Sequence, residues 1–126
     1  MLTLTHHLPL VAFDAGDVVV AEGGAPGAVW VLQSGSLRIT KDGREVNRAT
    51  RPGSLIGEIS ILLQIPNSAT VEAAEPSVMR YAADGKALLD RDPRIMRLVA
   101  AGLAERLNFV TTYLADLQRQ YGDAPG

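Results

Sequence analysis

Residues 57–71 read GEISILLQIPNSATV, and the meaning of this stretch decides how the chain is interpreted. A glycine and a glutamate lead into an apolar run, which a proline-bounded loop separates from an alternating tail. One interpretation is a turn of helix that joins two strands. The other is a cradle for a small anion, since free N–H groups and hydroxyls at such a corner can donate hydrogen bonds to it.

The surrounding sequence predicts a protein built mainly from β-strands. Between Asp17 and Ala82, Val, Ile, Leu and Thr recur with a period near two. Turn dipeptides interrupt this pattern at intervals of about 8–10 residues, which is typical of an antiparallel sandwich or roll. The predicted strands are residues 17–22, 29–33, 37–41, 45–50, 69–73 and 78–82.

After Ala83 the sequence predicts helix. Asp92 can accept a hydrogen bond as the N-cap, and Pro93 suits the first helical position, so a long helix should begin here and run to about Tyr121. Apolar residues recur along it at alternating intervals of four and three. This stripe packs either on the chain's own sheet or on a second copy, and the length of the helix favours a homodimer. Its members are Leu103, Leu107, Val110, Leu114, Leu117 and Tyr121.

Composition limits the classes of function. The chain has 126 residues, 47% apolar and 21% charged, with a net charge of −2. This predicts one domain, residues 1–126, without the broad basic field that nucleic-acid binding requires. No residue is cysteine, which excludes disulfides and thiolate sites. Without a signal peptide or an apolar run of ~20 residues, we expect a soluble, unprocessed cytoplasmic protein with no membrane contact.

Catalysis has little support in the sequence. A metal enzyme of the cupin kind needs several convergent ligands, whereas the two histidines, His6 and His7, are neighbours that one strand would direct to opposite faces. Neither histidine accompanies a recognisable nucleophilic serine motif. We therefore expect no metal, no cofactor and no catalytic residue.

Five stretches, taken in order, show a resemblance to a known family. They are FDAGDV (13–18) with Glu22-Gly23, VWVLQSGSLRI (29–39), Pro52-Gly53, IGE (56–58) and SATV (68–71), followed by the final helix. The chain resembles the cyclic-nucleotide-binding domain of the catabolite activator protein family over about residues 10–121.

The resemblance implies an eight-stranded double-stranded β-helix, a jelly-roll-like β-roll with a short cassette helix and a long C-terminal helix. The roll would span about residues 10–83, with the phosphate-binding cassette at 57–71 and C-terminal helices at about 84–121. In such domains the last helix mediates dimerisation. Because no helix-turn-helix follows within the 126 residues, we expect no DNA-reading element in this chain.

The resemblance also implies a ligand site for cyclic AMP or cyclic GMP. Glu58 would accept a hydrogen bond from the ribose 2′-hydroxyl, Ser68 would donate to the phosphate, and Gly57 would allow close approach of the backbone. Thr111 would reach into the pocket of the partner chain. The full set of expected ligand-binding residues is Gly57, Glu58, Ile59, Asn67, Ser68, Ala69 and Thr111.

Two positions depart from the family pattern. Asn67 replaces the arginine that pairs with the phosphate, and Val110 replaces a threonine that contacts the base. Loss of a charge-assisted hydrogen bond, about 1.5–3 kcal/mol, predicts affinity weakened by roughly tenfold to a few hundredfold. Three other arginines are candidates to replace the missing charge: Arg48, Arg51 and Arg80.

The sequence thus leaves two functions open. The first is a regulatory module that senses a cyclic nucleotide or a related small anion and signals through its cassette and C-terminal helix. The second is a degenerate module that binds no nucleotide and acts in dimerisation or protein–protein interaction. The chain either stands alone or belongs to a larger protein.

Overall fold

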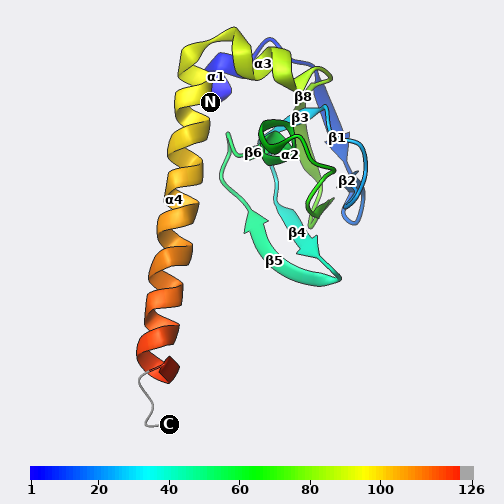
Figure 1. Ribbon diagram of the computed structural model, residues 1–126. Coiled ribbons are helices and arrows are strands. Elements are labelled where there is room, and N and C mark those ends of the chain that lie inside the picture. The colour runs from blue at the N-terminus through cyan, green and yellow to red at the C-terminus, as the bar shows by residue number, and fades with distance from the viewer. Residues whose placement is uncertain (123–126) are drawn as a thin grey trace.

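The computed structural model describes residues 1–122 and places a β-roll beside a long helix (Figure 1). A short helix, α1 (Leu2–Thr5), opens the chain. The other helices are α2 (Glu58–Leu63), α3 (Gly85–Arg91) and α4 (Pro93–Leu117), and a π-helical turn (Gln118–Gly122) follows α4. The strands are β1 (Leu10–Phe13), β2 (Val18–Val20), β3 (Val29–Ser34), β4 (Leu37–Lys41), β5 (Arg44–Ala49), β6 (Leu55–Ile56), β7 (Thr70–Ala73) and β8 (Ser77–Ala82).

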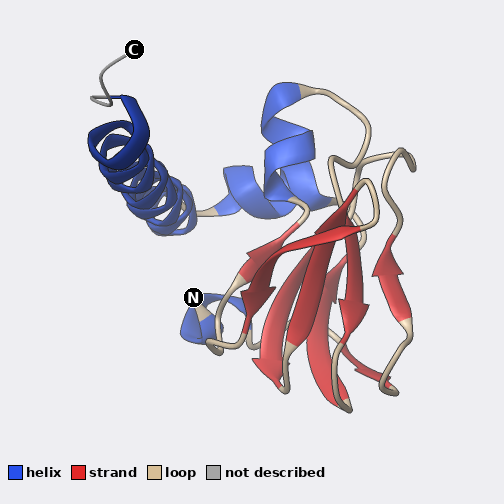
Figure 2. Cartoon of the chain, turned by 90° about the horizontal axis from the view of Figure 1, so that it is seen from below, coloured by secondary structure: helices blue, strands red, loops and turns tan. Residues whose placement is uncertain are grey.

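The eight strands form two antiparallel sheets of four, with strand orders β1-β8-β3-β6 and β2-β7-β4-β5. Figure 2 shows the strands gathered into one body with the long helix to its side. This confirms the predicted β-roll. The six strands predicted from periodicity all occur, each within two residues of its predicted ends. β1 and β6 were not predicted from the pattern. β6 has two residues, too few for alternation to be visible.

The core has two parts. One lies within the roll and contains Leu32, Leu37, Ile56, Val71 and Met79. The other joins the roll to the helices, because side chains of β3 pack with those of α3 and the first turns of α4. Its buried members are Val29, Val31, Leu55, Ala82, Leu88, Leu89, Ile95 and Val99.

The long helix begins at the predicted residue for the predicted reason. The Asp92 carboxylate accepts a hydrogen bond from the backbone N–H of Arg94 at 2.8 Å, and Pro93 occupies the first turn. α3, which ends at Arg91, precedes it as a separate helix capped by Asp84. The last buried residue of α4 is Val99, and the helix then continues past the roll (Figure 1). From Ala104 to Asp116 every residue of the helix is exposed within the described chain, and only Arg106 of these pairs with a residue of the cassette.

His6 and His7 lie in the segment between α1 and β1, not in a strand as the sequence interpretation assumed. The His6 ring bonds to the carbonyl of Thr3, and the His7 ring contacts Arg91. Within residues 1–122, no helix is both long and apolar enough to cross a membrane.

Candidate ligand site between the cassette and the long helix

The corner between β6 and α2 depends on Gly57. Its φ of 97° lies in the left-handed region, and a Cβ at this position would be 2.6 Å from the carbonyl oxygen of Ala28. Any side chain would therefore be strained and would also collide with the chain entering β3. This packing requires glycine independently of any ligand.

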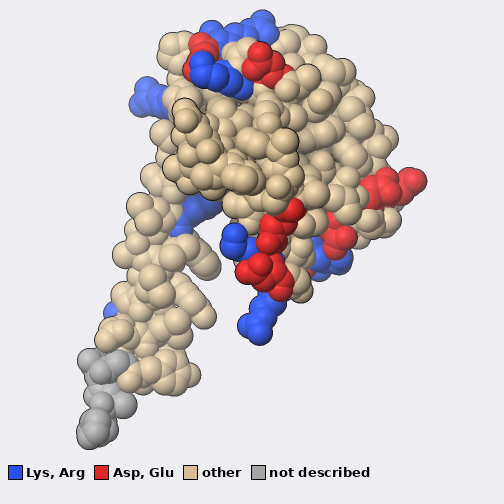
Figure 3. All heavy atoms as spheres, turned by 45° about the vertical axis from the view of Figure 1, so that its right-hand side comes forward, with Lys and Arg blue, Asp and Glu red and all other residues tan. Residues whose placement is uncertain are grey.

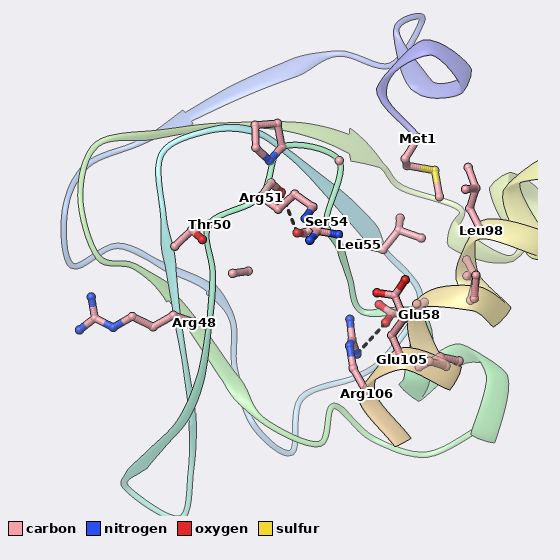
Figure 4. Close-up of a pocket in the computed structure, with 17 residues that line it drawn as sticks. Met1, Arg48, Thr50, Arg51, Ser54, Leu55, Glu58, Leu98, Glu105 and Arg106 are labelled. Atoms are coloured by element: carbon pink, nitrogen blue, oxygen red, sulfur yellow. Dashed lines mark hydrogen bonds and ion pairs between the residues drawn. The ribbon is translucent and has the colours of Figure 1, made fainter. Parts of the chain in front are cut away.

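Glu58, the first residue of α2, is only 3% exposed. Its carboxylate accepts a hydrogen bond from Arg106 of α4, with Oε1 and Nη1 3.3 Å apart (Figure 4). Burial raises the pKa of the Glu58 carboxyl above its ordinary value of 4.5, while a bond to its own backbone N–H and the charge of Arg106 oppose the rise. The cassette and the long helix are thus joined by an ion pair with a buried carboxylate.

A cavity of about 100 Å³ lies between the cassette and the roll. Five of the expected site residues line it: Gly57, Ile59, Asn67, Ser68 and Ala69. Alternation along a strand shows which side chains face inward but not which of them border a cavity, so the sequence pattern did not identify the other lining residues. These are Val20, Ile39, Leu55, Ile56, Ser60, Val71 and Arg106.

A larger groove, about 480 Å³, adjoins this cavity, since Leu55 and Arg106 line both. It runs between the segment that connects β5 to β6 and the first half of α4 (Figure 4). Glu58 lines the groove and not the cavity. Thr111 lies on the exposed half of α4 and lines neither hollow of its own chain.

Asn67 is hydrogen-bonded to the loop between β2 and β3. Its backbone N–H donates to the carbonyl of Gly24 at 2.9 Å, and its own carbonyl accepts from Gly23 at 2.8 Å. The side-chain amide donates to the carbonyl of Ala25 at 3.4 Å. The amide therefore supplies no charge to the cavity and is already engaged at its edge.

The three arginines proposed as replacements do not line the cavity. Arg80 donates to the carbonyls of His6 and Leu8, both at 2.8 Å, and so holds the N-terminal segment against the roll. Arg48 and Arg51 line the groove beside α4, where Arg48 pairs with Glu45 at 3.1 Å. Arg106, which was not among the candidates from the sequence, borders the cavity instead.

Comparison with known proteins identifies this arrangement. Residues 10–90 match the sequence model of the family described as "Cyclic nucleotide-binding domain". The chain belongs to the cyclic nucleotide-binding domain family. The matched residues run from the start of β1 into α3, so they include the whole β-roll and the cassette.

Relatives of this cyclic nucleotide-binding domain occur in much longer proteins. It is 36% identical over 88 residues to a cGMP-dependent protein kinase of Toxoplasma gondii, covering 70% of this chain and 9% of the kinase. It is 33% identical over 66 residues to a cAMP-dependent protein kinase regulatory subunit of Yarrowia lipolytica, covering 52% and 17% of the two chains. The chain thus spans less than a fifth of either relative.

Among solved structures, the domain is similar to the catabolite activator protein of Thermus thermophilus. The TM-score is 0.74 at 26% identity, and the match covers 92% of this chain and 57% of that protein. At this coverage the match must extend beyond the β-roll into the C-terminal helices. The domain therefore resembles regulatory ligand-binding modules.

Proposed function

We propose that this chain is a regulatory module that binds a cyclic nucleotide at its cassette and transmits binding to α4. The contact between Glu58 and Arg106 carries the proposal, because it joins the start of the cassette helix to the long helix. A ligand that changes the surroundings of Glu58 necessarily changes the energy of this contact. It can shift α4 only to the extent that it binds two helix positions with different affinity.

The chemistry of the two hollows suits the parts of such a ligand. Ser60 and Ser68 border the cavity and carry hydroxyls that can donate to a phosphate. The Glu58 carboxylate, which only accepts when ionised, suits a ribose hydroxyl. The cavity alone is smaller than the roughly 300–1,000 Å³ of usual ligand pockets, so the adjoining groove of about 480 Å³ would receive the rest of the molecule.

The proposal includes a homodimer formed through α4. Leu107, Val110 and Leu114 of the predicted stripe are 68%, 48% and 57% exposed, although they are apolar. Figure 3 shows this half of the helix extending beyond the roll with few charges on the visible face. Pairing with a second copy would bury the stripe and bring Thr111 to the partner's site.

The direct test is calorimetry with cyclic AMP and cyclic GMP, together with the shift in melting temperature. We expect saturable heat and a rise in melting temperature with either ligand, since a ligand that binds only the folded state stabilises it. If the Glu58 carboxylate accepts a hydrogen bond from the ribose 2′-hydroxyl, 2′-deoxy cyclic AMP should bind the wild type less tightly than cyclic AMP does. The difference should be smaller in Glu58→Gln, whose neutral amide oxygen accepts a weaker hydrogen bond. Neither heat nor a shift at millimolar ligand contradicts nucleotide binding.

A degenerate module is the second candidate, and two observations favour it. Most side chains that line the small cavity are apolar, and Asn67 is bonded to the β2–β3 loop. On this reading the same calorimetry gives no signal while the chain still dimerises. The two measurements together separate a receptor from a module that only associates. Either reading is compatible with the reducing cytoplasm that a cysteine-free sequence suits.

A further inference from the structure

The following inference rests on the proposed function and concerns charge. A cyclic nucleotide brings one negative charge to a site whose buried side chain, Glu58, is itself acidic. Arg106 borders the cavity, but its guanidinium already pairs with Glu58, so the two charges largely cancel. Asn67 is neutral. An anion bound here needs a further positive group, because burying an unpaired charge is costly.

Lys41 does not itself line the cavity, but its ammonium group contacts a residue that does. This lysine ends β4, and its Nζ donates to the carbonyl oxygen of Ser68 at 2.8 Å. Ser68 lines the cavity and follows Asn67 directly. The lysine therefore brings its charge to the cassette beside the residue that lacks one, from a strand 27 positions earlier in the chain.

The direction of Lys41 follows from the regularity of β4. Ile39 lines the cavity, and residues two apart in a strand project from the same face, so Lys41 leaves the strand on the cavity side. The β4–β7 register is continuous through Thr40 and Thr70. The irregularity between β4 and β5 places its extra residue, Val46, in β5, so it does not reverse the alternation in β4.

The Lys41 ammonium group also has free hydrogen-bond donors. It carries three donors, and the Ser68 carbonyl uses one. Among the described residues, no carboxylate lies within 4.0 Å of Nζ, so its charge is not cancelled as that of Arg106 is. A lysine in this state binds phosphate as a point charge.

We propose that Lys41 is the cation that contacts the cyclic phosphate in this domain. It approaches from β4 and contacts Ser68, the residue next to the position where the family arginine would stand. The contact with the Ser68 carbonyl holds the ammonium near the site, and the bound anion takes the remaining donors.

The experiment measures the dissociation constant of cyclic AMP by calorimetry for the wild type, Lys41→Met, Lys41→Arg and Lys86→Met. Lys86, the only other lysine, lies on α3 and pairs with Asp90, so it is a matched control. We expect Lys41→Met to weaken binding tenfold or more. Lys41→Arg should stay within a few-fold of the wild type, and Lys86→Met should be unchanged.

Two measurements distinguish a charge contact between Lys41 and the ligand from a merely structural role for Lys41. First, loss of a charge contact should reduce the salt dependence of binding in Lys41→Met, which a displaced loop would not do. Second, the double variant Lys41→Met/Asn67→Arg should regain wild-type affinity or better, because a positive charge returns to the cassette at the position next to Ser68. A misplaced cassette would not be rescued in this way.

The outcomes also distinguish this inference from the proposed function. If the wild type binds cyclic AMP and Lys41→Met binds equally well, the role of Lys41 is wrong and the receptor function stands. If the folded wild type binds nothing at millimolar ligand, the proposed function is contradicted, and with it the claim that Lys41 provides sufficient charge.

Discussion

At the scale of single residues, the site depends on three side chains near the cassette with different charges. Glu58 is buried and paired with Arg106, whereas Asn67 offers only a neutral amide to the loop beside it. The exchange of arginine for asparagine was visible in the sequence. The partners of Glu58 and Asn67 were not, because Arg106 and Ala25 lie 48 and 42 positions away in the chain.

Replacing Asn67 with arginine should strengthen cyclic-nucleotide binding by tenfold or more. The new guanidinium would add a charge-assisted bond to the phosphate, about 1.5–3 kcal/mol net. Calorimetry of Asn67→Arg against the wild type measures the change. Asn67→Gln, which lengthens the side chain without adding charge, is the control and should not gain affinity. An unchanged dissociation constant in Asn67→Arg means that position 67 does not face the phosphate.

The raised pKa of Glu58 predicts a specific dependence of stability on pH. Because the folded state holds this proton more tightly than the unfolded chain, the contribution of Glu58 is fully present below its ordinary pKa of 4.5 and is lost as pH rises through the raised value. Urea unfolding of wild type and Glu58→Gln, in a pH series that begins at the ordinary value of 4.5 and extends upward, tests this. The stability of the wild type relative to the variant should fall as pH rises, and a constant difference contradicts the prediction.

At the scale of elements, α3 connects the cassette to the base of the long helix. Gly85 begins α3, and a Cβ there would overlap Ile61 of α2 and lie 2.8 Å from the carbonyl oxygen of Gly27. That carbonyl also accepts the Gly85 N–H at 2.7 Å. Because the packing is tight, a shift of α2 would displace α3. α3 leads directly into α4.

Two glycine-to-alanine variants should therefore have opposite effects. Gly85→Ala should destabilise the fold by about 1–3 kcal/mol through overpacking. Gly102→Ala, inside α4 with nothing within 4 Å of the new Cβ, should stabilise it by about 0.5–1 kcal/mol, because alanine loses less backbone entropy in a helix. Urea unfolding at one fixed protein concentration measures both. Equal effects of the two substitutions would show that the α2–α3 contact is looser than described.

At the scale of the whole molecule, the roll is a compact body and α4 forms an arm that extends beyond it (Figure 1). Leu103 packs against the core, whereas Leu107, Val110 and Leu114 are exposed. An isolated helix of this kind gains little stability by itself, since most helical stability comes from packing an apolar face. The shape thus favours association through the arm.

The variant Leu107→Lys/Leu114→Lys should dissociate the proposed dimer. Each leucine contributes about 1.5–3 kcal/mol when fully buried, and lysine would add like charges across the interface. Multi-angle light scattering should give twice the monomer mass for the wild type and the monomer mass for the variant. Thr112→Lys, on the opposite face of the helix, should remain dimeric. A monomeric wild type at high micromolar concentration contradicts the dimer.

Periodicity and capping chemistry by themselves determined the six longer or better-bounded strands and the start of α4 at Pro93, because both signals act between residues close in sequence. The resemblance to the cyclic-nucleotide-binding family, carried by short motifs, is what indicated that residues 57–71 form a cassette that lacks its arginine. Only the tertiary structure decided which polar groups are in contact. Packing of the sheets and the helices brings Arg106 to Glu58, Lys41 to Ser68 and Ala25 to Asn67. These contacts depend on where distant elements cross and which rotamers their side chains adopt, and no local pattern encodes either.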